Sequence, residues 1–156
     1  MNTVSALNID YPGKDTVTLY QYIYKNAQYG MGALGKILEH QDHSELTEIL
    51  KGQQRGYTAI LREAANVLAI SGIRPIGLKN SEKLEICFLL RCLSLKKNAT
   101  SLPSIAGMVI LGTTIGGIKG AKESNLCPGA DPASKALLER LLRFEEANCR
   151  RLKSFL

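Results

Sequence analysis

The segment TVTLYQYIYKNAQYGMGALGKIL, residues 16–38, decides the fold class of this chain. Its apolar side chains recur every three or four residues, which is the spacing of one buried helical face. Asp15 is the expected N-cap, and the helix is expected to end near Gln41. The apolar positions are Tyr20, Ile23, Tyr24, Ala27, Met31, Leu34 and Leu38.

The rest of the chain shows the same period and no sustained alternation of period two, so we expect an all-α protein. Asp42 or Ser44 should cap a second helix that stops at Ser71-Gly72, where glycine suits a left-handed C-cap. A shorter helix is expected between residues 80 and 98. Two long helices should follow, one with Pro103 in its first turn and ending near Lys122, the other capped by Asp131 with Pro132 at its first position.

Loop lengths predict how these helices connect. The first two long helices are joined by a few residues, and so are the last two, which makes each pair an antiparallel hairpin. Residues 73–101 are long enough to return along the bundle between the hairpins. We therefore expect one domain, residues 1–156, built as a four-helix bundle with a short helix in the crossover and residues 1–14 as an N-terminal arm.

Charge and cysteine content limit the classes of function. The net charge is +6, but the basic residues are scattered over several helices, so nucleic-acid binding is only a weak alternative. Residues 1–13 lack the features of a signal peptide, which favours a cytoplasmic location. Cys87, Cys92, Cys127 and Cys149 fit no metal-binding spacing and are expected to be free thiols.

Two of the long helices carry the same short motif. Glu63-Ala64-Ala65-Asn66 lies in the second helix and Glu145-Glu146-Ala147-Asn148 in the last. We place both motifs on the seam between the polar and the core face.

With these helices the chain resembles the ferritin-like superfamily, in particular the uncharacterised ferritin-like bundle proteins of clostridia and related bacteria. The resemblance covers nearly the whole chain. It rests on Leu19-Tyr20-Gln21-Tyr22-Ile23-Tyr24-Lys25-Asn26-Ala27, on Ile105-Ala106-Gly107-Met108 with Leu111-Gly112-Thr113, and on Leu142-Arg143-Phe144-Glu145-Glu146-Ala147-Asn148 with Leu152-Lys153-Ser154-Phe155-Leu156.

The resemblance implies a place for a pair of metal ions, since ferritin-like bundles bind them with Glu-x-x-His motifs. Here Asn66 and Asn148 occupy the histidine positions, and the helical stretches 16–38 and 104–122 offer no carboxylate. Glu63 with Glu145 or Glu146 are the remaining candidate ligands. We therefore expect no cofactor, and a metal-binding or di-iron-type oxidoreductase bundle is the alternative.

The two histidines, His40 and His43, sit with Glu39 and Asp42 at the turn between the first two helices. Imidazoles and carboxylates together could bind Zn²⁺ or another divalent ion. The other interpretation is a solvated turn in which Asp42 is a cap.

Glycines recur at positions where helices could approach closely. Gly112, Gly116 and Gly120 form a ridge, for which a tight helix crossing is the first explanation and a subunit interface or a ligand-sized groove the others. The apolar run from Ile105 to Ile118 is shorter than the ~20 residues of a membrane span, so we expect a buried helix. Gly30 to Gly35 spell G-x-G-x-x-G, but without a preceding strand this favours helix packing over nucleotide binding.

No nucleophile–base arrangement is present in the sequence. The resulting hypothesis is a non-enzymatic ferritin-like bundle that acts through self-association, as a homo-oligomer, or through a protein partner.

Overall fold

The computed structural model describes residues 11–94 and 101–156. Most of the expected N-terminal arm, residues 1–10, and the expected end of the short helix, residues 95–98, lie outside the described residues. Within them the chain is helical and contains no strand, which confirms the all-α prediction. The helices are α1 (Lys14–Leu38), α2 (Ser44–Ile70), α3 (Asn80–Ser94), α4 (Leu102–Leu126), α5 (Pro132–Leu152) and the short 3₁₀ helix η1 (Lys153–Phe155).

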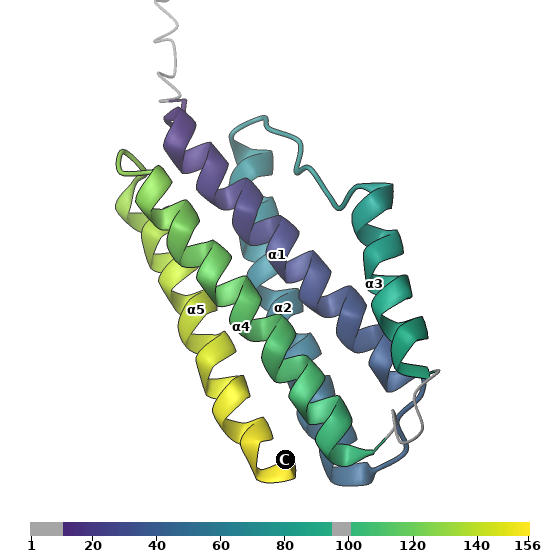
Figure 1. Cartoon of the computed structure of the whole chain (residues 1–156). Coiled ribbons are helices and arrows are strands. Elements are labelled where there is room, and N and C mark those ends of the chain that lie inside the picture. The colour runs from purple at the N-terminus through teal and green to yellow at the C-terminus, as the bar shows by residue number, and fades with distance from the viewer. Residues whose placement is uncertain (1–10, 95–100) are drawn as a thin grey trace, which may run out of the picture.

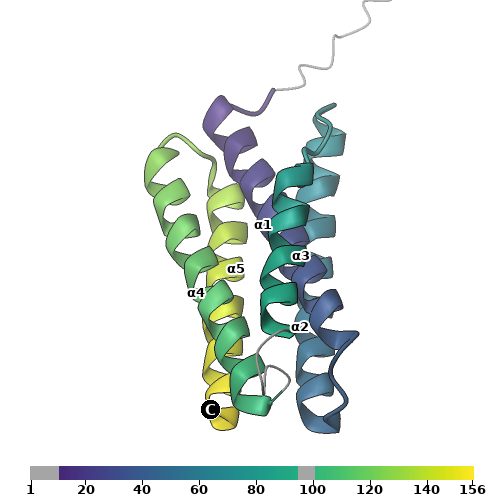
Figure 2. The same cartoon turned by 45° about the vertical axis from the view of Figure 1, so that its right-hand side comes forward.

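The four long helices lie side by side as two antiparallel hairpins, α1 with α2 and α4 with α5 (Figure 1). The hairpins meet where α1 packs on α4 and α5 and where α2 packs on α5. Helix α3 lies against α1 and runs back along the molecule, so that α2 and α4 point in the same direction (Figures 1 and 2).

The helix ends follow partly from the expected caps. Gly72 closes α2 with φ of +71°, and the Ser134 backbone N–H donates to Asp131 Oδ1 at 2.8 Å at the start of α5. The cap of α2 is instead His43, whose Nδ1 accepts from the Leu46 backbone N–H at 3.5 Å. Asp15 is not a cap, because α1 begins at Lys14; its Oδ2 accepts from the Gly129 backbone N–H at 2.8 Å and ties the two hairpins together.

The core consists of aliphatic side chains from α1, α2 and α5, which have the amphipathic period of helices that bury one face. Its most deeply buried large members are Leu19, Ile23, Leu46, Leu50, Leu68, Leu138, Leu141 and Leu152. Helix α4 contributes Ile105, Ala106 and Val109, which lie near its start. Gly120 is the buried residue in its second half.

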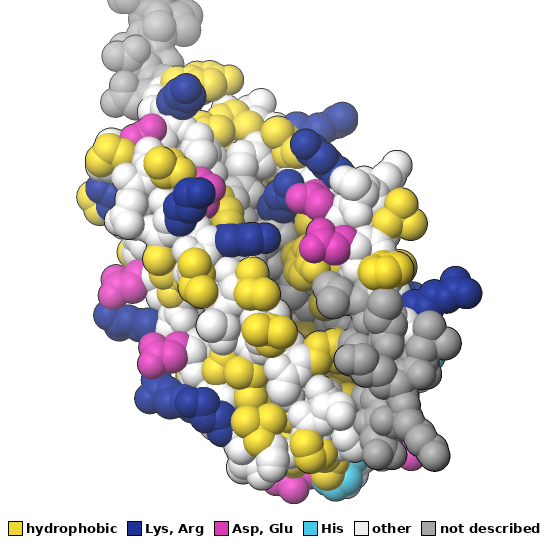
Figure 3. All heavy atoms as spheres, viewed as in Figure 1, with side chains coloured by type: hydrophobic (Ala, Val, Ile, Leu, Met, Phe, Trp, Pro, Cys, Tyr) yellow, Lys and Arg dark blue, Asp and Glu magenta, His cyan; other side chains and the backbone are white. Residues whose placement is uncertain are grey.

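The expectation that α4 is a buried helix is wrong. Leu111, Ile115 and Ile118 are 62%, 45% and 67% exposed, and hydrophobic side chains run along this face of the molecule (Figure 3). The reason is that α3, as far as the structure describes it, packs mainly on α1. Helix α4 is long and apolar enough to cross a membrane, judged by length and composition alone. Core helices of soluble proteins meet the same criterion, although they are mostly buried. In α4, 17% of the most apolar 18-residue window is buried.

Candidate functional site

The two Glu-x-x-Asn motifs occupy different environments, so the expectation that both lie on the seam between the polar and the core face is wrong: the first is exposed and the second is buried. The Glu63 side chain is 49% exposed and forms an ion pair with Arg140 on the surface, and Asn66 is exposed. Glu145 and Asn148 are buried, at 4% and 7% exposure. The structure therefore does not bring Glu63 and Glu145 together.

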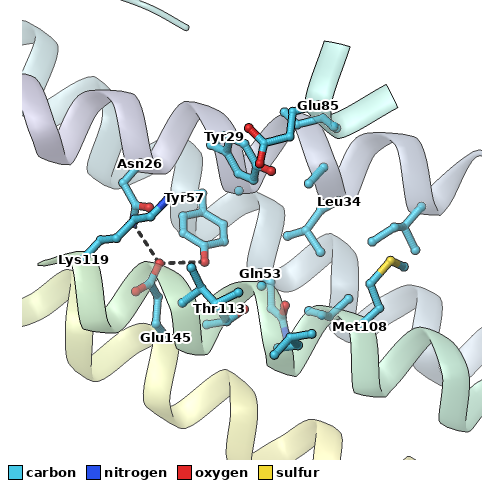
Figure 4. A pocket seen from close by; sticks show the side chains of 18 residues that line it. Asn26, Tyr29, Leu34, Gln53, Tyr57, Glu85, Met108, Thr113, Lys119 and Glu145 are labelled. Atoms are coloured by element: carbon cyan, nitrogen blue, oxygen red, sulfur yellow. Dashed lines mark hydrogen bonds between the residues drawn. The ribbon is translucent and has the colours of Figure 1, made fainter. Parts of the chain in front are cut away.

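Glu145 is the centre of a cluster of polar side chains between the helices. The Asn26 side-chain Nδ2 from α1 donates to Glu145 Oε1 at 2.9 Å, and the Tyr57 hydroxyl from α2 donates to the same oxygen at 3.0 Å. Figure 4 shows the three side chains converging from three helices, with Thr113 and Lys119 of α4 beside them.

Helix α4 can approach this carboxylate because residue 116 is glycine. A Cβ at this position would stand 3.3 Å from Asn26 Oδ1 and 3.4 Å from Glu145 Oε1. The Tyr22 hydroxyl donates to the Gly116 carbonyl oxygen at 3.0 Å and holds the two helices together.

The glycine ridge of α4 thus serves a tight crossing within the chain at two of its three positions. At Gly120 a Cβ would stand 2.7 Å from a methyl group of Leu142. At Gly112 a Cβ would meet nothing within 4 Å. A subunit interface at the ridge remains a prediction.

Tyr57 is held in place by its ring as well as by its hydroxyl. The ring meets Phe144 edge to face, with centroids 5.1 Å apart, and a Cβ on Gly30 would be 2.7 Å from its atoms. Gly30, the first residue of the G-x-G-x-x-G motif, therefore makes room for an aromatic ring, in line with the helix-packing interpretation.

Burial shapes the electrostatics of the group. Desolvation raises the pKa of Glu145 to about 7, against the hydrogen bonds from Asn26 and Tyr57, which favour the carboxylate. Desolvation, together with the nearby Glu145 charge, raises the pKa values of Tyr57 and Tyr22 above the usual range of phenols. At neutral pH the two tyrosines are therefore neutral hydrogen-bond donors, and Glu145 is poised between its two protonation states.

Several buried polar atoms here have no hydrogen-bond partner among the described residues. They are Glu145 Oε2, Gln53 Nε2 and Asn148 Nδ2. Gln53 is 3% exposed. Most buried polar atoms in folded proteins are paired, so this group calls for an explanation.

Glu145 and Gln53 line one cavity of about 220 Å³ between α1, α3 and α4. The walls are mainly apolar, and the cavity is partly open to solvent. Lys119 and Glu85 also line it (Figure 4). Its apolar lining includes Leu34, Ile37, Ile86, Met108, Val109 and Ile115.

The other expected ligands are spread over the surface. Glu146 is exposed and lies 3.6 Å from Arg150; His40 is exposed, and His43 is used as a helix cap. In the described part of the chain no group of three or more His, Cys, Asp or Glu residues is placed to hold a metal ion. Cys87, Cys127 and Cys149 are free thiols, and the side chain of Cys92 lies outside the described residues.

Sequence reasoning missed Asn26, Gln53 and Tyr57 as members of the site. A signal was available for Gln53. It falls in phase with the buried positions Leu46, Leu50, Tyr57 and Ile60 of α2, and a polar residue on a buried stripe indicates a partner or a ligand.

Comparison of the chain with protein-family models, with curated proteins and with solved structures gave no match. The assignment of a function therefore rests on the geometry of the molecule.

Proposed function

We propose that this chain is a ferritin-like helical protein that acts through self-association and not through catalysis, with α4 pairing against α4 of a second copy. The observation that carries this proposal is the exposed apolar stripe on α4, made of Leu111, Ile115 and Ile118. These positions are four and three residues apart and so share one helical face.

The ferritin-like part of the proposal is supported by the order and direction of the helices. Two antiparallel hairpins are joined by a long connection, which contains α3 and lets α2 and α4 run the same way (Figure 1). This is the connection of ferritin-like bundles.

The composition of α4 supports a second copy as the partner. The helix carries no charged residue from Leu102 to Ile118, whereas Lys119 and Lys122 follow directly. In an antiparallel pair the lysines of one copy lie beside the uncharged half of the other, which keeps like charges apart. Burying each large aliphatic side chain contributes about 1.5–3 kcal/mol, and a symmetric pair buries every stripe residue twice.

Sedimentation velocity at micromolar concentration tests this proposal. The wild-type chain is expected to sediment as a dimer, and a Thr114→Lys/Ile118→Lys variant as a monomer. Both positions are exposed and neither lines the cavity. Ile70→Lys is the matched control, because Ile70 is 84% exposed at the end of α2.

A wild-type chain that is monomeric at these concentrations contradicts the proposal. So does a dimer that Ile70→Lys dissociates as effectively as the α4 variant. Circular dichroism of each variant verifies that the helices are kept.

A further inference from the structure

We infer that the cavity between α1, α3 and α4 is a binding site for a small arylalkylamine, whose ammonium group is held by Glu145 and whose apolar body lies along the cavity wall. The site adjoins the stripe proposed for self-association, and Leu111 and Ile115 belong to both.

Only one oxygen of the Glu145 carboxylate has hydrogen-bond partners among the described residues. Oxygen Oε1 of Glu145 accepts from both Asn26 and Tyr57, whereas the buried Oε2 has no partner in the described part of the chain. A carboxylate oxygen is an acceptor, so the missing partner is a donor. An ammonium group is the donor that also offsets the buried negative charge.

The described part of the chain does not itself supply this cation. Among the described residues no Lys, Arg or His nitrogen makes an ion pair with Glu145, although Lys119 lines the same cavity. The partners that Glu145 does have, an amide and a phenol, are neutral. A buried carboxylate without a cation is costly, and a ligand that brings a cation lowers this cost.

The size and the apolar lining of the cavity suit an aromatic ring with a short side chain. An engineered apolar cavity of about 150 Å³ binds benzene, so about 220 Å³ here accommodates a ring with a short side chain. The apolar walls from α1, α3 and α4 suit the ring. Gln53, whose buried amide nitrogen has no partner among the described residues, belongs to the same wall.

Calorimetric titration at pH 8 with phenethylamine and with 2-phenylethanol tests the inference. The two probes share a ring and an ethyl chain and differ in charge. The amine is expected to bind about tenfold or more tightly than the alcohol, since a charge-assisted hydrogen bond is the stronger one.

Variants of Glu145 and of its neighbour Glu146 test whether the negative charge of Glu145 holds the amine. Glu145→Gln keeps the shape of the side chain and is expected to weaken amine binding about tenfold or more, while the affinity for the alcohol stays within about twofold. Glu146→Gln, one residue away on the exposed face, should change neither affinity.

A third variant tests the location. Gly112 lines the cavity, and a Cβ there meets nothing within 4 Å, so Gly112→Leu is expected to fill the space and abolish binding of both probes without unfolding the chain. The inference is overturned if neither probe binds the wild-type chain at 10 mM (about the upper limit of such titrations), or if the alcohol binds as tightly as the amine. Amine binding that survives Glu145→Gln or Gly112→Leu overturns it equally.

Discussion

The two Glu-x-x-Asn motifs have the same sequence pattern, but one is buried and the other is exposed. In α5 the motif faces inward, and Glu145 accepts hydrogen bonds from Asn26 and Tyr57 at the edge of a cavity. In α2 the motif faces outward, and Glu63 pairs with Arg140 in solvent. The local pattern is therefore no guide to the environment of these carboxylates.

The difference follows from the phase of each motif relative to the apolar stripe of its helix. In α5, Glu145 and Asn148 continue the series of buried positions Leu138, Leu141 and Leu152 at steps of three and four. In α2 the buried series runs through Ile60, Ala64 and Leu68, so that Glu63 and Asn66 fall outside it. A polar residue in phase with the core becomes a buried group that needs partners, and one out of phase becomes a surface residue.

The strongest test of this comparison removes one partner of each glutamate. Tyr57→Ala deletes a buried ring packed on Phe144 and leaves Glu145 with one donor. We expect it to lower the free energy of unfolding by about 3–5 kcal/mol. Arg140→Ala should cost less than about 1 kcal/mol, because the ion pair with Glu63 is exposed.

Urea denaturation of both variants measures these changes. Equal losses of stability for Tyr57→Ala and Arg140→Ala would show that the two motifs are equally important to the fold, against this comparison.

The pH dependence of stability gives a second test. Because burial raises the pKa of Glu145 from 4.5 in the unfolded chain to about 7 in the folded one, the folded state binds the extra proton. The contribution of Glu145 to the free energy of unfolding is therefore most favourable below pH 4.5. It falls by about 3 kcal/mol as the pH rises to about 7.

The phenols and the thiol around Glu145 do not titrate in this window. The pKa values of Tyr22 of α1, Tyr57 of α2 and Cys149 of α5 are all raised above their usual range. Glu145→Gln should therefore flatten the loss of stability between pH 4.5 and 7 and leave the variant more stable than the wild type at pH 8. The matched control Glu63→Gln should keep the wild-type slope, and a slope that survives Glu145→Gln would contradict the assignment.

The smallest expected effect concerns two glycines on α4. Gly112→Ala should stabilise the chain by about 0.5–1 kcal/mol, because alanine favours the helix and the added Cβ meets nothing. Gly116→Ala should forfeit that gain, because its Cβ would press on Asn26 and Glu145. Thermal unfolding of the two variants side by side measures the difference, and an equal gain at both positions would mean that the surroundings of Glu145 are loosely packed.

Much of the fold could be predicted from the sequence, because helix formation leaves local signals. The period of α1, Gly72 at the end of α2, and Asp131 with Pro132 at the start of α5 were all predicted correctly. The start of α1 and the cap of α2 were missed, and α4 ends at Leu126 instead of near Lys122. Gly13 and Asp15 compete for the cap of α1, as His43 and Ser44 do for the cap of α2, and small differences in local geometry choose between them.

The candidate site was less predictable. Its polar groups come from separate helices, Asn26 from α1, Gln53 and Tyr57 from α2, and Glu145 from α5. No spacing in the sequence connects them. The one local signal of the site was the position of Gln53 among the buried residues of α2. That position predicts that Gln53 is buried but not which residue or ligand it contacts.

By itself the sequence determined that the chain is helical, where some of its helices begin or end, and which face of α1, α2 and α5 is apolar, because periodicity and caps act over a few residues. Only the tertiary structure decided that α3 lies against α1 and that Leu111, Ile115 and Ile118 of α4 are exposed among the described residues. The period of a helix says which side is apolar and not what covers it. The same holds for the carboxylates. The packing of α1, α2 and α5 around Glu145, and not the Glu-x-x-Asn pattern, gives it neutral partners, a raised pKa and a cavity at its side.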